Sequence, residues 1–302
     1  MNRPEPETPV VFECDGTELL GILHRGSAQA TRAVLIAVGG PQYRVGSHRQ
    51  FVLLARRLAD AGIPTLRFDY RGMGDSAGEA RSFENIGSDL RAAIDRLYAQ
   101  RPRLREVVLW GLCDAASACA LYAPTDPRVA GLVLLNPWVR TASGEARAYL
   151  RHYYLGRLLS RGFWRKALGG QLDLRGSWRG MIGFLVQARD RRDAEGSSAT
   201  TSATAAAHAA HAIPLPQRML RALEAFDGRT LLILSGNDLT AQEFSDLLRA
   251  SRRWRRWARR ATVARRALAP ADHTFSSQPW RAQVEDWTLD WLRAWPMPER
   301  RA

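Results

Sequence analysis

Lysine is almost absent from this chain of 302 residues: of its 44 basic side chains only Lys166 is a lysine, so 43 are arginine. Against 30 acidic side chains this leaves a formal net charge of +14. Such a charge is typical of proteins that bind nucleic acids, but no motif of a nucleic-acid-binding fold accompanies it. A preference for arginine is also expected of a GC-rich genome, so we expect no nucleic-acid partner.

Cysteine and long apolar runs are scarce as well. Cys14, Cys113 and Cys119 are too few and too scattered for a disulfide framework or a metal site, and we expect no cofactor. No uncharged apolar run approaches the ~20 residues that span a bilayer, and the first residues lack the apolar core of a signal peptide. We therefore expect a cytoplasmic location, where a free thiol stays reduced. A hydrophobic content of 46% excludes a disordered chain.

Short apolar segments alternate with helical periodicities, which predicts a mostly parallel sheet with helices on both faces. The strands are expected at 10–12, 19–23, 33–38, 64–68, 107–110, 129–135, 230–234 and 262–267. The first two are expected to be antiparallel. Helices are expected from Ser47, from Ser82, and over 115–122 and 240–260. A last helix places four tryptophans on one face, which indicates a packing surface.

The alternation stops after Trp138 and returns near residue 226. Residues 139–225 are rich in arginine and aromatic residues, show helical periodicity, and include a low-complexity segment at 193–212. The sequence therefore predicts an α/β core formed by 1–138 and 226–302 with a helical insert between them. We expect the insert to act as a lid that selects the substrate; the alternative is a solvated segment without contact to the substrate.

The segment Gly111-Leu112-Cys113-Asp114-Ala115 has the context of a nucleophile elbow, because a strand precedes it and a helix follows. Small residues at 111 and 115 avoid clashes in such a tight turn. The N–H groups and dipole at the start of the helix favour a thiolate. The sequence therefore predicts Cys113 as a nucleophile; the alternative is a buried structural cysteine.

The remaining members of a catalytic triad follow in the order that this type of site requires. Asp238 comes after the strand at 230–234, and His273 comes after the last short strand. No other histidine is so placed, and His24 and His48 are expected to be surface or capping residues. The sequence thus predicts the triad Cys113, Asp238 and His273, with a turn aspartate as the alternative for Asp238.

The oxyanion hole should combine the N–H of Asp114 with one N–H from the loop after the third strand. Pro41 in that loop cannot donate, which leaves Gly40 or Gln42, and the sequence does not separate them. The side chains of Asp114 and Asp272, each adjacent to a predicted catalytic residue, are expected to point away from the site.

These motifs, together with a turn at 69–76 to which we assign no catalytic role, resemble the α/β-hydrolase superfamily over the whole chain except the insert. The segments GGPQYRVGSHRQFVLLAR (39–56) and LWGLCDAASA (109–118) resemble the first of two hydrolases encoded beside exosortase A. Such systems are associated with bacterial exopolysaccharide export and PEP-CTERM protein sorting. The resemblance implies an α/β-hydrolase fold with an inserted lid and a hydrolase of unassigned substrate. A cysteine nucleophile is also similar to dienelactone hydrolases and polyhydroxyalkanoate synthases.

We therefore expect cleavage of an ester or thioester in a small-molecule acyl substrate, with acyl transfer by the same triad as the alternative. A second alternative is a non-catalytic scaffold. The segment 252–266 holds eight arginines and no acid, interleaved with Trp254 and Trp257, and could dock on an anionic membrane surface, polysaccharide or nucleic acid. The favoured interpretation is an ordinary surface helix with buried tryptophans and solvated arginines.

Overall fold

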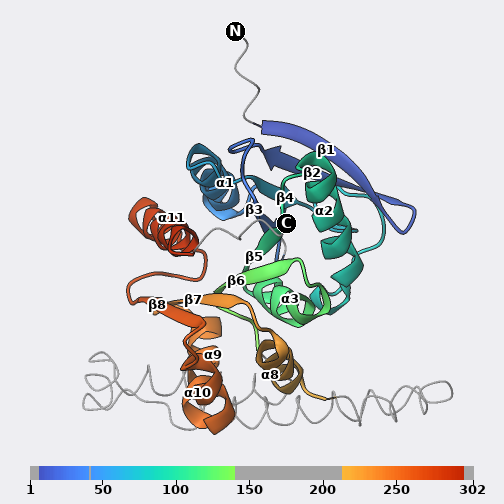
Figure 1. Cartoon of the computed structure of the whole chain (residues 1–302). Coiled ribbons are helices and arrows are strands. Elements are labelled where there is room, and N and C mark those ends of the chain that lie inside the picture. Colours follow the sequence, from blue (N-terminus) through green and yellow to red (C-terminus); the bar gives the residue numbers. More distant parts are fainter. Residues whose placement is uncertain (1–6, 41, 140–212, 296–302) are drawn as a thin grey trace, which may run out of the picture. The chain divides into compact units, whose positions relative to one another are not determined.

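The computed structural model describes residues 7–40, 42–139 and 213–295. In this part of the chain eight strands form a sheet in the order β1-β2-β4-β3-β5-β6-β7-β8 (Figure 1). Strands β3 to β8 run parallel, whereas β2 is antiparallel to both β1 and β4. The strands are β1 (Glu7–Cys14), β2 (Thr17–His24), β3 (Arg32–Ala37), β4 (Thr65–Phe68), β5 (Glu106–Leu112), β6 (Val129–Leu135), β7 (Arg229–Ser235) and β8 (Val263–Leu268). The predicted mostly parallel sheet is therefore confirmed.

Two layers of helices bury the sheet. On β3 the side chains of Val34 and Ile36 enter one apolar cluster, while those of Leu35 and Ala37 enter the other, because successive side chains point to opposite faces. One face is covered by α1 (Gln50–Asp60) and α11 (Gln278–Arg293). The other is covered by α2 (Gly87–Gln100), α3 (Asp114–Tyr122), α8 (Leu215–Ala225), α9 (Leu239–Ala250) and α10 (Arg252–Ala258).

The single helix expected over 240–260 is two helices. Ser251 is extended, with φ −107° and ψ 126°, and its hydroxyl accepts a hydrogen bond from the N–H of Trp254 at 3.5 Å. A serine in this conformation is a favourable N-cap, so it ends α9 and starts α10 within two residues.

Helix α8 falls inside the range predicted for the insert, yet it packs on the core. Met219 and Leu223 are almost completely buried and join the cluster that contains α3. The core therefore begins again at Leu215 rather than at 226, because this amphipathic helix buries its apolar stripe there. The rest of the insert, including the low-complexity segment 193–212, lies outside the described residues.

The tryptophans of α11 and its C-terminal end form a packing surface, as predicted. Trp280, Trp287 and Trp291 pack on the cluster under α1, and the rings of Trp291 and Trp295 meet edge to face at 4.7 Å. His24, by contrast, is buried and not at the surface: the guanidinium of Arg67 donates to its Nε2 at 2.9 Å. Burial lowers the pKa of His24 to about 4, so this imidazole accepts as a neutral ring.

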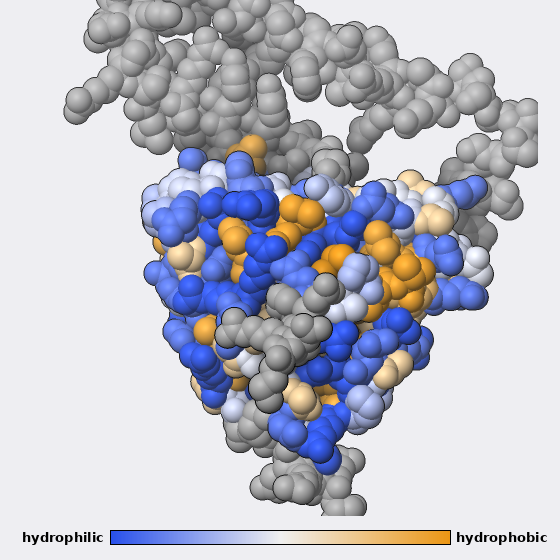
Figure 2. All heavy atoms as spheres, turned by 90° about the horizontal axis from the view of Figure 1, so that it is seen from above, coloured by the Kyte–Doolittle hydropathy of each residue, from blue (hydrophilic) through white to orange (hydrophobic). Residues whose placement is uncertain are grey.

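The exposed surface carries no large apolar area in the view from above. Figure 2 shows apolar residues in several small groups, separated by polar side chains. Among the described residues the large apolar side chains with substantial exposure are Val11, Tyr43, Ile213 and Leu239. No described helix combines the length and apolar character needed to cross a membrane.

Candidate active site

Cys113, Asp238 and His273 are brought to one edge of the sheet. They follow the ends of β5, β7 and β8, which belong to the continuous parallel part of the sheet. The carboxyl ends of parallel strands lie at the same edge, where α/β proteins place their sites. Residues 125 positions apart in the chain therefore become neighbours through topology alone.

The turn at Cys113 has the geometry of a nucleophile elbow. Its φ of 63° and ψ of −123° lie in a region that non-glycine residues rarely adopt. The N–H of Cys113 donates to the carbonyl of Leu135 at 2.9 Å, and its carbonyl accepts from Trp138 at 3.1 Å. A Cβ on Gly111 would lie 2.7 Å from the carbonyl oxygen of Ala115, so this position requires glycine. The surrounding backbone thus holds the thiol at the turn in a partly exposed position.

The imidazole of His273 joins the carboxylate to the thiol. Its Nδ1 lies 3.0 Å from Oδ2 of Asp238, and the ring also hydrogen-bonds Cys113. The hydrogen bond with Asp238, followed by that with Cys113, raises the pKa of His273 to about 10. Burial pushes the pKa of Asp238 up, but the hydrogen bond and charge of His273 outweigh it and leave that pKa below its usual range. The pair therefore favours an imidazolium held by a carboxylate.

Asp238 is fixed by its place at the start of α9. Its carboxylate accepts from the N–H groups of Thr240 at 3.3 Å and Ala241 at 3.0 Å, which makes it the N-cap of the helix. Oδ2 serves both the helix, through Ala241, and the histidine, whereas Oδ1 accepts from Thr240. The side chain therefore has the contacts of a helix-capping turn aspartate and also lies against His273.

The side chain of Asp114 points into the site, so the expectation that it points away is wrong. Its carboxylate accepts from the N–H of Gly40 at 3.0 Å and from that of Ala115 at 2.9 Å. A Cβ on Gly39 would overlap Oδ1 of Asp114, so only glycine allows this approach. Burial raises the pKa of Asp114, which these two hydrogen bonds offset in part.

This contact bears directly on the predicted oxyanion hole. Of its candidate donors, the N–H of Gly40 is occupied by the carboxylate of Asp114. Gln42 lies in the same loop, and its side-chain oxygen accepts from the N–H of Ser47 at 3.1 Å. In the free protein the N–H of Gly40 therefore already has an anionic acceptor.

Asn136 is a positioning residue that the sequence did not reveal. It is completely buried after β6, and its Nδ2 donates to the hydroxyl of Ser235 at 2.9 Å and to the carbonyl of His273 at 3.0 Å. Its Oδ1 accepts from the N–H of Ser235 at 2.9 Å. One amide thus ties the end of β7 to the histidine loop. The available signal was a polar Asn-Pro pair directly after a buried strand.

The other carboxylates near the site have structural partners. Asp272 accepts from the N–H of Ser276 at 2.9 Å and from its hydroxyl. Asp69 is buried at the start of the turn 69–76 and accepts from the N–H of Arg44 at 2.6 Å. Among the described residues no group of three or more His, Cys, Asp or Glu is arranged to hold a metal ion.

Comparison with known sequences concerns the family of the chain. The model of the family described as serine aminopeptidase, S33, matches residues 29–258. The quorum-quenching protein AidA of Acinetobacter baumannii (strain MDR-ZJ06) is 27% identical over 148 residues, which is 45% of this chain and 46% of the relative. The polyketide transferase grgF of a Penicillium species is 25% identical over 147 residues, 47% of this chain and 49% of the relative. The chain thus spans about half the length of these curated relatives.

Comparison with solved structures concerns the fold alone. The Pyrococcus furiosus esterase Pf2001 aligns with a TM-score of 0.62 at 14% identity, over 97% of this chain and 93% of the esterase. The α/β-hydrolase GrgF of Penicillium sp. sh18 aligns with a TM-score of 0.58 at 17% identity, over 95% and 98%. The expected α/β-hydrolase fold is therefore confirmed.

Proposed function

Because the chain belongs to the serine aminopeptidase S33 family of α/β-hydrolases, we propose that it cleaves an ester or thioester through an acyl-enzyme formed on Cys113. The description of the family names serine, whereas the nucleophile position of the elbow in this chain holds a cysteine. The observation that carries the proposal is the imidazole of His273, which hydrogen-bonds both Asp238 and Cys113. This is the contact that a base needs in order to take the proton of a nucleophile.

The reaction proceeds in two halves. The proton that Cys113 and His273 share lies on His273, which the site favours as an imidazolium, so that Cys113 attacks the carbonyl carbon as a thiolate. The imidazolium then gives this proton to the leaving alcohol or thiol as its bond to carbon breaks. This leaves a thioester on Cys113. His273 then takes a proton from water, the resulting hydroxide attacks the thioester, and the carboxylic acid and free thiol are released. Asp238 orients the ring and stabilises its cationic form throughout.

The developing oxyanion is held in this scheme by the N–H of Asp114 together with that of Gly40 or Gln42. Since the carboxylate of Asp114 accepts from Gly40 in the free protein, it must release that N–H before the oxyanion can use it. A carboxylate close to a developing negative charge also opposes the transition state. In this scheme the backbone N–H of Asp114 stabilises the oxyanion, while its carboxylate competes with the oxyanion for the N–H of Gly40.

The test is turnover of a model thioester and of a p-nitrophenyl ester by the purified protein. Cys113→Ala and His273→Ala should each lower kcat by about 10³-fold or more, as expected when one member of a triad is removed. Cys14→Ala, at a buried cysteine in β1, is the control and should keep the activity. Rapid quenching with mass spectrometry should find the acyl group on Cys113. Full activity of both site variants would refute the assignment.

Acyl transfer is the second candidate, and one observation favours it. The relative grgF is described as a transferase, and the thioester on Cys113 is activated enough to acylate a hydroxyl or an amine as well as water. Products should be analysed after incubation with a model thioester, with and without a glycosyl acceptor. Acylated acceptor supports transfer; free acid alone supports hydrolysis.

We place this activity in the cytoplasm and in exopolysaccharide metabolism linked to exosortase. The basis is the resemblance of the segments 39–56 and 109–118 to the first hydrolase of such systems. Inactivation of the gene in its own host should then change the acylation or the export of exopolysaccharide. Unchanged polysaccharide would remove this biological setting and leave the chemistry as proposed.

A further inference from the structure

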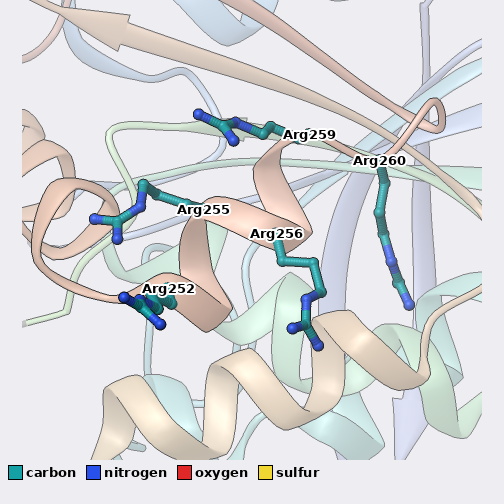
Figure 3. A pocket seen from close by; sticks show the side chains of 5 residues that line it. All are labelled: Arg252, Arg255, Arg256, Arg259 and Arg260. Atoms are coloured by element: carbon teal, nitrogen blue, oxygen red, sulfur yellow. The ribbon is translucent and has the colours of Figure 1, made fainter.

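Away from the active site, arginines of α10 and of the turn after it surround a concavity of about 530 Å³. Figure 3 shows their side chains extending outward from this short helix and turn. We call them the five-arginine cluster: Arg252, Arg255, Arg256, Arg259 and Arg260. We propose that the five-arginine cluster is a binding site for a ligand that carries several phosphate groups.

The helix that carries the cluster is anchored by its opposite face. Trp254 and Trp257 are each 2% exposed, and the ring of Trp254 meets those of Phe244 and Trp257 edge to face at 5.3 Å and 5.6 Å. Packing of this kind fixes the backbone of α10 on α9 and the core. The guanidinium groups therefore project from a rigid support, which lowers the entropy lost when they bind a ligand.

The five arginines of the cluster make no ion pair with a described carboxylate, although Glu224, which pairs with Arg253, lies beside Arg260. Arg260 donates to the carbonyl oxygens of Leu223 and Glu224 at the end of α8, and Arg255 donates to the carbonyl of Arg249. These contacts hold two of the side chains in place without neutralising them. Several uncompensated guanidinium groups around one concavity form a strongly attractive site for a polyanion.

The chemistry of the lining favours a compact polyanion such as a chain of phosphates over a ligand that needs stacking or apolar contacts. All five side chains are arginines, whose planar groups bind phosphate oxygens in pairs. The interleaved tryptophans are buried, so they can neither stack on bases nor insert into lipid. A compact chain of phosphates satisfies the charge without requiring either kind of apolar contact.

The cluster is separate from the catalytic edge. Arg260 comes three residues before the start of β8, whereas His273 follows the other end of that strand. Six residues of strand span roughly 20 Å, which places the cluster toward the opposite edge of the sheet. Binding should therefore leave Cys113 accessible, and the inference does not depend on the proposed function.

Calorimetric titration with tripolyphosphate tests the site. We expect binding in about 50 mM salt that weakens steeply with added salt, and much weaker binding of orthophosphate. The double variant Arg252→Glu/Arg256→Glu should weaken binding about tenfold or more, and Arg252→Gln/Arg256→Gln by a smaller factor. The matched control, Arg265→Glu/Arg266→Glu on β8, changes the net charge equally at exposed positions and should bind almost as the wild type does. Cys113→Ala should also bind normally.

Three results would overturn the proposal. One is no binding of tripolyphosphate at low salt by a folded protein, and another is an equal loss in the control variant, which would indicate a general charge effect. The third is stronger binding to anionic phospholipid vesicles or to single-stranded DNA, with either displacing tripolyphosphate. That outcome would make the surface a membrane or nucleic-acid interface. Circular dichroism of each variant establishes that it is folded.

Discussion

Removal of the Asp114 carboxylate should make the protein a faster catalyst and a less stable one. In the free protein this carboxylate accepts from the N–H of Gly40 at 3.0 Å. A hydrogen bond to a charged group contributes about 1.5–3 kcal/mol. An oxyanion that must displace it loses that amount, which corresponds to about 10- to 100-fold in kcat/KM. Asp114→Ala keeps the backbone N–H of residue 114 and removes the competitor, so kcat/KM should rise by a factor in this range.

The same substitution should cost stability, because Asp114 lies in the first turn of α3. A carboxylate at a helix N-terminus contributes about 0.3–1 kcal/mol through the helix dipole. Steady-state turnover of a model thioester and urea unfolding, each on wild type, Asp114→Ala and Asp114→Asn, measure both effects. The neutral amide should give a smaller rate increase than alanine. A tenfold fall in kcat/KM for a folded Asp114→Ala protein would refute the reasoning and assign the carboxylate a productive role.

Three further perturbations follow from the site. The contribution of the His273–Asp238 pair to stability is fully present below pH 6.5 and is lost as the pH rises through the pKa of about 10. It is also lost in acid as Asp238 is protonated, so the Tm difference between wild type and Asp238→Asn should be largest between about pH 4 and 6.5 and smaller at high pH, where only the contacts of the carboxylate with the start of α9 and with a neutral ring remain. Asn136→Ala should lower kcat more than it changes KM, because the carbonyl of His273 loses its donor; an unchanged kcat would contradict this role. Gly111→Ala should destabilise the fold by about 1–3 kcal/mol in urea unfolding, since the added methyl group meets the backbone of Ala115.

Periodicity and chain order predicted most of the architecture. Apolar runs marked each strand, and the positions of Cys113, Asp238 and His273 relative to β5, β7 and β8 placed the three side chains together. These inferences succeed because they depend on local pattern and on topology. Both are properties of the order of residues along the chain.

The errors share a different physical origin. Ser251 interrupts an arginine-rich helical pattern, and only its extended conformation shows that it caps a new helix. His24 looks like a surface residue until Arg67, on the neighbouring strand β4, supplies a donor in the interior. Asp114 and Asn136 act through contacts with segments that are distant in sequence. The direction of a side chain in a loop depends on its tertiary partners. Neither secondary-structure propensity nor the spacing of residues along the chain predicts these partners.

The backbone conformation at Cys113 exposes the thiol but lowers the stability of the fold. A side chain held near φ 63° and ψ −123° costs of order 1–3 kcal/mol relative to glycine, which enters such regions freely. Glycine at position 113 would remove this cost, but glycine has no thiol. Keeping the thiol therefore means keeping the conformational cost, which lowers the free energy of unfolding. The hydrogen bonds of Cys113 with Leu135 and Trp138 hold this conformation, which an isolated turn would not adopt.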